Sequence, residues 1–308
     1  MKKIRIEIVT PVHNRRDLTL QFLKSLSRID RTNLQTHIII VDDGSTDGTV
    51  EAVREKFPDV EIVAGDGDLW YTAGTNLGLE TALKYDPDYI LAVNNDSVFD
   101  ENFLRYMVEC AEKFRRSVVG AVLLDWTAPH RVFQVSPKWD LWKGGFRHWW
   151  KQTVWTLPQK PWEVELIVGN CVLYPAQAVR EAGFMDAKRL PHFGDAEYTP
   201  RMRRKGWRLL IEPRARVFCL PNTLPPSLRT MSFKEILKAH FAEPMNPYSV
   251  QRRYYATLAG APNRFQGLLA FALFFVRLAL GKDVEGKWAL LRDEKPLSET
   301  FAKSIAED

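Results

Sequence analysis

Short apolar runs alternate with amphipathic segments along the first third of the chain. Four runs have the length and composition of β-strands: residues 6–10, 38–41, 60–63 and 89–93. In the segments between them, apolar residues recur every three or four positions, which predicts helices that bury one face. This β-α-β-α-β-α-β order indicates an α/β fold with a mostly parallel sheet flanked by helices. Its ligand-binding edge is expected at the carboxyl ends of the strands.

Polar residues follow three of the predicted strands. They are Thr10, His13 and Asn14 after the first strand, Asp42 and Asp43 after the second, and Asn94, Asn95 and Asp96 after the fourth. Each group alone could be turn or helix-capping chemistry. Together they meet at one edge of the sheet, where Asp96 can hold a divalent cation that bridges to phosphates. The neighbouring hydroxyls, amides and carboxylates can hydrogen-bond a nucleoside.

Composition and missing motifs narrow the class of ligand. The chain has 308 residues, of which 45% are hydrophobic, and a net charge of +5. This excess suits an anionic ligand or membrane surface and is too small to indicate nucleic acid. No Gly-x-Gly-x-x-Gly follows the first strand and no P-loop motif occurs, which disfavours dinucleotide and P-loop nucleotide binding. Cys110, Cys171 and Cys219 do not have the spacing of a disulfide framework or zinc site, and Arg5 and Glu7 interrupt any signal-peptide core. We therefore expect a cytoplasmic protein.

The segment 125–165 has a different character. It contains seven of the ten tryptophans: Trp126, Trp139, Trp142, Trp149, Trp150, Trp155 and Trp162. Tryptophan faces bind sugars and also anchor proteins at membrane interfaces. A surface loop packed by its own aromatic side chains explains this composition equally well, so both interpretations stay open.

Regular structure is predicted to resume after the tryptophan-rich segment. We expect a strand over 164–168 that continues through 171–174, a helix over 175–183, and strands over 208–211 and 215–220. These elements would extend the sheet of the first half.

The last part of the chain, residues 223–308, is predicted to be helical and basic, with helices over 233–241 and 248–258. The apolar stretch 267–281 is shorter than the roughly 20 residues that span a bilayer, and Arg277 interrupts it. A buried or interfacial helix is the expectation. The flanking positive charge favours peripheral contact with the inner face of the cell membrane over docking on the rest of the chain or on a homodimer partner.

Four segments together carry a family resemblance. They are Thr10-Pro11-Val12-His13-Asn14-Arg15, Val41-Asp42-Asp43-Gly44-Ser45, Thr75-Asn76-Leu77-Gly78 and Asn94-Asn95-Asp96-Ser97. In this order and spacing they resemble the signature of the family-2 glycosyltransferases. The resemblance implies a GT-A fold, a nucleotide-sugar donor and inversion of the anomeric configuration. Residues 67–76, with Asn-Asn-Asp in place of the commoner Asp-x-Asp, are most similar to the bacterial rhamnosyltransferase-like branch.

The resemblance also implies roles for the residues at the sheet edge. Asp96 would bind the divalent cation, Mn²⁺ or Mg²⁺. The donor-binding residues would be Thr10, Pro11, His13, Asn14, Asp43, Trp70, Gly74, Asn76, Asn94 and Asn95. Many relatives have a histidine where this chain has Cys219, which leaves the metal ligands incomplete unless His240 or a C-terminal arginine substitutes.

On the acceptor side, Gly194-Asp195-Ala196-Glu197 and Gly206-Trp207 match a segment of the family. Asp195 could simply be a helix N-cap. An inverting transferase, however, needs a base within reach of the acceptor hydroxyl. The resemblance therefore assigns Asp195 as the catalytic base and Glu197 as the weaker candidate. Gly169, Asn170 and Glu197 are the expected acceptor-binding residues.

These expectations define a domain plan and a function. Residues 1–222 would form the GT-A catalytic domain, with a nucleotide-sugar half at 1–124 and an acceptor half at 125–222, followed by the helical region 223–308. The implied reaction moves a sugar, rhamnose included, from a dTDP- or UDP-type donor to a bacterial surface glycan or its lipid-linked precursor. A non-catalytic sugar-nucleotide or glycan-binding protein is the alternative. A sugar nucleotidyltransferase is less favoured, because no Gly-rich basic loop follows the first strand.

Overall fold

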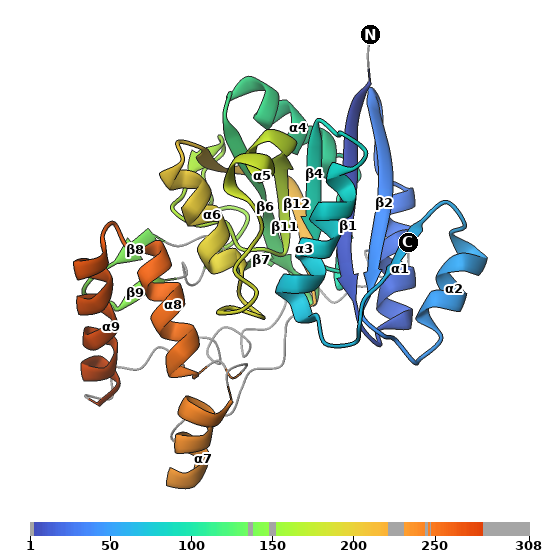
Figure 1. Ribbon diagram of the computed structural model, residues 1–308. Helices are drawn as coiled ribbons and strands as arrows, with labels where there is room; N and C mark the ends of the chain where they lie inside the picture. Colours follow the sequence, from blue (N-terminus) through green and yellow to red (C-terminus); the bar gives the residue numbers. More distant parts are fainter. Residues whose placement is uncertain are drawn as a thin grey trace.

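A ten-stranded mixed sheet runs through the part of the chain described by the computed structural model (Figure 1), which comprises residues 3–134, 138–147, 152–220, 231–243, 246 and 248–279. Its strands are β1 (Ile4–Val12), β2 (Leu34–Asp42), β3 (Glu61–Ala64), β4 (Tyr89–Val93), β5 (Ser97–Phe99), β6 (Ser117–Asp125), β7 (Ala128–Gln134), β10 (Trp162–Glu163), β11 (Cys171–Pro175) and β12 (Arg208–Cys219). The main order is β10-β12-β6-β11-β4-β1-β2-β3, with β5 paired to β12 and β7 to β6. A separate hairpin joins β8 (Lys138–Asp140) and β9 (Gly145–Arg147).

The parallel half of this sheet confirms the predicted βα alternation. Strand β1 pairs in parallel with β2 and β4, and β2 pairs in parallel with β3. Val12 lies opposite Asp42, and Val9 lies opposite Ala92, so these strands end at the same edge. The polar residues that follow them are thereby brought to one side of the molecule.

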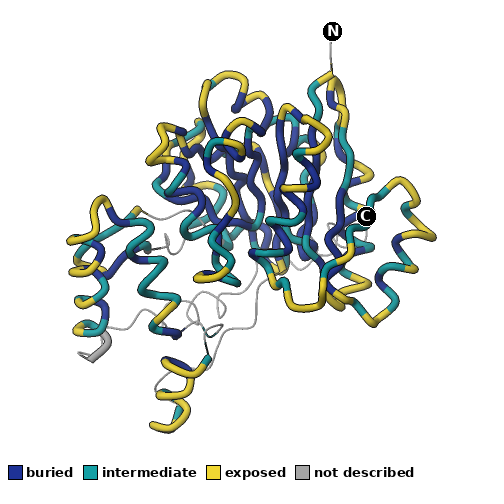
Figure 2. Tube along the Cα trace, viewed as in Figure 1, coloured by how far each residue is buried: buried dark blue, intermediate teal, exposed yellow. Residues whose placement is uncertain are grey.

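Helices cover both faces of the sheet. They are α1 (Arg16–Ser27), α2 (Thr49–Lys56), α3 (Trp70–Leu83), α4 (Phe103–Lys113), α5 (Ala176–Ala182) and α6 (Asp195–Arg204). The core clusters place α1 and α4 on one face and α3, α5 and α6 on the other. Figure 2 shows the resulting pattern, in which the central strands are buried and the outer faces of the helices are exposed.

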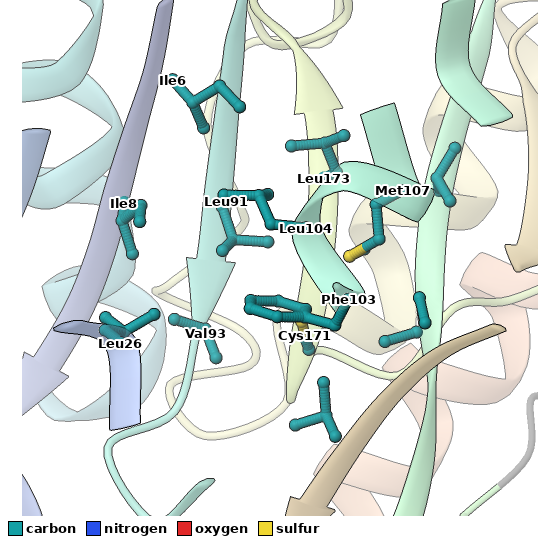
Figure 3. Packing of buried hydrophobic residues seen from close by; sticks show 14 of the residues in the cluster. Ile6, Ile8, Leu26, Leu91, Val93, Phe103, Leu104, Met107, Cys171 and Leu173 are labelled. Carbon is teal, nitrogen blue, oxygen red and sulfur yellow. The ribbon is translucent and has the colours of Figure 1, made fainter. Parts of the chain in front are cut away.

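The side chains of β4 alternate between the two faces. Leu91 and Val93 lie among Leu26, Phe103 and Leu104 in the cluster under α1 and α4 (Figure 3). The intervening residues of β4 belong to the other cluster, under α3 and α5. Burial on both faces explains why this strand is a continuous apolar run, and each buried aliphatic side chain contributes about 1.5–3 kcal/mol.

Several predicted elements have different bounds, and one is wrong. Residues 164–168, all buried except Glu165, form no strand. The Val164 N–H donates to the Leu209 carbonyl of β12 at 2.9 Å, but the Ile167 N–H donates to the Thr199 hydroxyl at 3.0 Å, so the pairing with a strand does not continue. The predicted strands 208–211 and 215–220 are one strand, β12, with an irregularity between Glu212 and Arg216. The helix predicted over 175–183 is confirmed as α5, which ends at Gly183 with φ of +73°.

The later helical elements are α7 (Phe233–Leu237), a π-helical turn over Lys238–Ala242, α8 (Val250–Gly260) and α9 (Arg264–Ala279). Of these, α8 and α9 pack on the β8–β9 hairpin. A side chain at Gly144 would strike Phe274 of α9, and one at Gly260 would strike the Phe146 ring of β9. The close approach therefore requires glycine at both positions. Among the described residues, no helix is long and apolar enough to span a bilayer.

The described tryptophans of the segment 125–165 differ in their exposure to solvent. Trp139 is partly buried, and its ring N–H donates to the Thr257 carbonyl of α8 at 3.4 Å. Trp142 and Trp155 are exposed. Trp149 and Trp150 lie outside the described residues, as do residues 223–230 and 280–308 of the predicted helical region 223–308.

Candidate active site

Asp96 lies directly after β4, at the edge where the parallel strands end. Its Oδ2 atom accepts a hydrogen bond from Arg15 Nη1 at 2.9 Å. In the described part of the chain its Oδ1 atom is buried and has no hydrogen-bond partner. Burial raises the pKa of the Asp96 carboxyl, and the Arg15 guanidinium partly opposes that shift. A buried carboxylate oxygen without a partner fits the role of a ligand to a hard cation.

A cation at Asp96 would have few protein ligands. No group of three His, Cys, Asp or Glu side chains suited to a metal occurs within the residues that the structure describes. Cys219 lies beside this site, with its Sγ 3.6 Å from Ser97 Oγ, and burial raises the pKa of its thiol, which stays neutral. The His240 Nδ1 lies 2.8 Å from the Ile236 carbonyl within the C-terminal helices. One carboxylate, with substrate phosphates and waters, suits Mg²⁺ or Mn²⁺, because small hard cations keep part of their water shell.

Asp43 organises the loop that leads into α3. Its Oδ1 accepts the Gly67 N–H at 2.9 Å, and its Oδ2 accepts the N–H groups of Leu69 at 3.0 Å and Trp70 at 3.1 Å. The carboxylate therefore satisfies backbone donors at the start of this helix. The Trp70 side chain is 46% exposed and makes an edge contact with the ring of His192.

The residues after β1 are tied to the loop after β2. The His13 Nδ1 lies 2.6 Å from the Asp43 carbonyl, and Asn14 Oδ1 accepts the Thr46 N–H at 2.7 Å. Thr10 is completely buried, so direct contact with a ligand would require its neighbours to move. Pro11 lies against Gly74, where an added side chain would approach the Pro11 Cβ to 3.0 Å.

Three predicted asparagines connect separate parts of the chain. Asn76 makes two hydrogen bonds of 2.9 Å, its side-chain amide donating to the Met185 carbonyl and its Oδ1 accepting the Met185 N–H. The Asn95 amide donates to the Thr19 hydroxyl of α1 at 2.9 Å. The Asn94 backbone N–H donates to the Asn170 carbonyl at 3.1 Å. Through this last bond the predicted donor and acceptor residues become neighbours.

Asp195 is the first residue of α6 and belongs to the same site. Its Oδ2 accepts the Gly169 N–H at 2.9 Å, and the Gly169 carbonyl accepts the Tyr71 hydroxyl at 3.1 Å. A side chain at Gly169 would strike both Tyr71 and Asp195, so only glycine allows this approach. Burial raises the pKa of the Asp195 carboxyl, while hydrogen bonds from Gly169 and Ala196 oppose the shift. Burial thus makes Asp195 a stronger base than an exposed aspartate.

Glu197 is engaged elsewhere on α6. Its carboxylate pairs with Arg201, with Oε1 2.7 Å from Nε and Oε2 3.0 Å from Nη2. Arg201 also donates to the Phe184 carbonyl at 2.6 Å, beyond the end of α5. The Glu197 carboxylate therefore holds Arg201 in a structural ion pair, which leaves Asp195 the better-placed candidate for a base.

The sequence interpretation missed the residues that position Asp195. The Thr72 hydroxyl of α3 donates to the Leu190 carbonyl at 2.6 Å and accepts the Gly194 N–H at 3.1 Å. The Thr72 N–H donates to the Pro191 carbonyl at 2.9 Å. The segment before Asp195 is thus fixed on the first turn of α3. The only sequence signal for this role of Thr72 is the run Tyr71-Thr72 next to the glycine-rich loop. That run does not identify a partner more than a hundred residues away.

Comparisons with known proteins show what the chain is similar to. The model of the family described as glycosyl transferase family 2 matches residues 7–168. An N-acetylglucosaminyl-diphospho-decaprenol L-rhamnosyltransferase of Mycobacterium tuberculosis is 23% identical over 219 residues, which cover 64% of this chain and 70% of the relative. The matching protein of a second M. tuberculosis strain gives the same values.

Solved structures share the fold at low sequence identity. GalNAc-T7, crystallised with UDP, GalNAc and Mn²⁺, has a TM-score of 0.59 and 12% identity, and the match covers 90% of this chain and 57% of that one. Residues 1–349 of S. aureus TarS give a TM-score of 0.54 and 14% identity over 89% of this chain and 71% of that one. The mannosyltransferase PcManGT of Pyrobaculum calidifontis, in complex with GDP-Man and Mn²⁺, has a TM-score of 0.50 and 19% identity, and the match covers 94% of this chain and 79% of that one. These likenesses confirm a glycosyltransferase GT-A fold.

The Asp43 network generates a stability prediction. Asp43→Asn replaces one accepting oxygen by an amide that cannot accept, which leaves at least one of the backbone N–H groups of Gly67, Leu69 and Trp70 unpaired. We expect a loss of about 1–3 kcal/mol in the free energy of unfolding, measured with denaturant, and faster proteolysis within 65–70. The control Asp66→Asn keeps an accepting oxygen for the Asp68 N–H in an exposed loop, and should change stability by less than about 0.5 kcal/mol. Equal stability of the two variants would contradict the role given to Asp43.

Proposed function

Because the chain belongs to glycosyl transferase family 2, we propose that it is an inverting enzyme that moves a sugar from a nucleoside diphosphate sugar to an acceptor hydroxyl. The observation that carries the proposal is that two carboxylates with different partners, the buried Asp96 and the partly buried Asp195, belong to segments joined by the hydrogen bond from the Asn94 N–H to the Asn170 carbonyl. Asp96 has one oxygen without a partner in the described structure, and Asp195 is held by the Gly169 amide in the neighbouring segment. One suits the charged donor, and the other suits proton removal from the acceptor.

In the proposed reaction, the acceptor oxygen forms a bond to the anomeric carbon as the bond from that carbon to the diphosphate oxygen breaks. Asp195 takes the acceptor proton, and the nucleoside diphosphate leaves with the electron pair of the broken bond. The Gly169 N–H fixes the orientation of the Asp195 carboxylate during this step. A divalent cation held by Asp96 would supply neutralisation of the negative charge that develops on the diphosphate.

The finer specificity is also a proposal. The rhamnosyltransferase relative supports a deoxysugar donor of the dTDP or UDP type, rhamnose included, and an acceptor linked to a lipid through a diphosphate. The Mn²⁺ in two of the similar structures supports Mn²⁺ or Mg²⁺ as the cofactor. Thr10, Pro11, His13, Asn14, Asp43, Trp70, Gly74, Asn76, Asn94 and Asn95 stay the proposed donor residues, several of them acting through the loops that they hold. Gly169 and Asn170 stay on the acceptor side, and residues 1–222 the proposed catalytic domain.

The C-terminal helices give the proposed enzyme a surface for a lipid-linked acceptor. Large apolar side chains are exposed on α7, on α9 and on the π-helical turn: Phe233, Leu237, Phe241, Phe265, Leu268 and Val276. Positive charge from Arg264 and Lys234 lies on the same helices. We propose that these helices contact the inner face of the cell membrane peripherally. A homodimer interface is the competing use of this surface.

Substitution of Asp195 tests the assignment of the base. Asp195→Asn preserves the shape of the side chain and removes its ability to accept a proton, so transfer should fall by about 10²–10⁴-fold. The affinity for the nucleoside diphosphate, measured by calorimetry, should stay within about threefold of wild type. Glu197→Gln is the matched control on the same helix and should retain most of the activity. Undiminished transfer by Asp195→Asn would remove this residue from the role.

The raised pKa of Asp195 also predicts a pH dependence. Only the ionised carboxylate can accept the proton, so transfer should fall as the pH drops through the pKa of Asp195 in the folded protein. Burial raises that pKa, and the acidic limb of kcat/KM should therefore lie above the ordinary aspartate value of about 3.9. An acidic limb at or below this value in a pH series would show that the base is a more exposed carboxylate.

Asp96 is tested through the metal dependence of binding. Asp96→Ala should abolish the gain in nucleoside diphosphate affinity that Mn²⁺ gives to the wild type, a loss of about 10- to 100-fold in a calorimetric titration. Asp100→Ala is the control, because Asp100 lies in the same connection between β4 and α4 but accepts the Asn102 N–H. A metal-dependent gain that survives in Asp96→Ala would place the cation elsewhere.

A further inference from the structure

Arg252 reaches the candidate site from the C-terminal helices. It lies in the first turn of α8, and this helix packs against α6, whose first residue is Asp195 (Figure 1). The Arg252 guanidinium lies over the ring of Phe193, in the segment that Thr72 fixes before Asp195. A residue far from the family signature therefore contributes a cation to the site.

One terminal nitrogen of the Arg252 guanidinium has no hydrogen-bonding partner among the described residues. Within the ranges that the structure describes, Arg252 Nη1 is buried and unpaired. The Asp195 carboxylate, which is the charge that favours the ionised arginine, accepts its hydrogen bond from Gly169. Burial lowers the pKa of Arg252 to about 9, and the neighbouring Arg253 adds to this effect. A buried donor of this kind is costly unless an anion completes its shell.

The guanidinium of Arg15, which has a carboxylate partner, differs in this respect from that of Arg252. Arg15 and Arg252 both lie close enough to His192 to lower the pKa of its ring, in addition to the larger effect of burial. Arg15 has a carboxylate partner in Asp96, at 2.9 Å. Arg252 is the other cation near His192, and the described residues supply no oxygen to its Nη1. The planar, forked guanidinium group matches the oxygens of a phosphate.

We propose that Arg252 binds a phosphate oxygen of a substrate diphosphate, an inference that rests on the glycosyl transfer proposed above. Two sources share this chemistry. One is the diphosphate of the sugar donor, whose departing negative charge Arg252 would stabilise. The other is a diphosphate that joins an acceptor sugar to a lipid, a group present in the named substrate of the mycobacterial relative. In either case α8 would belong to the substrate site and not only to a peripheral surface.

The test separates phosphate binding from every other role of the side chain. Arg252→Met keeps an unbranched side chain to pack on Phe193 but removes the charge, and Arg252→Lys keeps a charge without the fork. Arg253→Met is the matched control, because the Arg253 guanidinium lies over the Phe274 ring of α9. Circular dichroism establishes that each variant is folded. Calorimetry then compares UDP with uridine, and dTDP with thymidine, in the presence of Mn²⁺.

Arg252→Met should lose about 10- to 100-fold in affinity for the nucleoside diphosphate that wild type binds and should bind the nucleoside normally. Arg252→Lys should lose less, and Arg253→Met should match wild type. A second outcome would assign Arg252 to the diphosphate of the acceptor. In that case Arg252→Met leaves the affinity for the nucleoside diphosphate unchanged, and raises KM for a short-chain alkyl sugar diphosphate but not for the alkyl glycoside.

Two results would overturn the proposal. In the first, Arg252→Met changes neither the affinity for the nucleoside diphosphate nor KM for the alkyl sugar diphosphate. In the second, Arg252→Met loses the same factor in affinity for the nucleoside as for the nucleoside diphosphate. An upward shift of the acidic limb of kcat/KM with unchanged diphosphate binding would show that Arg252 acts only on the pKa of Asp195. Wild type that binds neither nucleoside diphosphate would instead count against the proposed function, so the two failures are distinct.

Discussion

The antiparallel pairing of β11 with β4 is the constraint on which the site depends. Cys171 lies opposite Val93 in this pairing, so the turn at Gly169 and Asn170 must lie beside the end of β4. The Asn94 N–H bonds to the Asn170 carbonyl there, and the Gly169 N–H extends the connection to Asp195. Two carboxylates from distant parts of the chain are thereby held at one sheet edge by backbone hydrogen bonds. The geometry is fixed before any ligand binds, which is the condition for electrostatic catalysis.

The same edge concentrates charge in a buried environment. Burial raises the pKa values of Asp96 and Asp195 and lowers that of Arg252, so each ionised group is less stable than it would be in water. Backbone amides from Gly169 and the guanidinium of Arg15 offset part of that cost. The remaining imbalance favours ligands that bring a cation to Asp96 and an anion to Arg252. A nucleoside diphosphate with its divalent cation has this combination of charges.

The parallel half of the fold could be predicted because its central strands, β1 and β4, are buried on both faces and each helix on one. Both patterns are local in the sequence. They predicted where the strands end, and therefore the positions of Asp43 and Asp96 at the edge of the sheet. The strand predicted over 164–168 was wrong because a largely apolar run has the same pattern whether its backbone continues to pair with a strand or, as at Ile167 here, bonds to the Thr199 hydroxyl. The sequence allowed for a C-terminal arginine at the site, but neither the contact of Arg252 with Phe193 nor that of Thr72 with Leu190 was predictable, for a related reason. These contacts span more than 50 residues, and nothing in the neighbouring sequence marks them.

The most direct test of the account is slow cleavage of donor sugars in the absence of acceptor. Purified protein would be incubated with UDP-, dTDP- and GDP-sugars, dTDP-rhamnose among them, with and without Mn²⁺ or Mg²⁺, and the released nucleoside diphosphate measured. A transferase site that activates water in place of the acceptor should release the nucleoside diphosphate from one class of donor, in a reaction that needs the cation and is lost in Asp195→Asn. Tight binding of a nucleotide sugar without any cleavage would contradict the account and would identify the fold as a binding module.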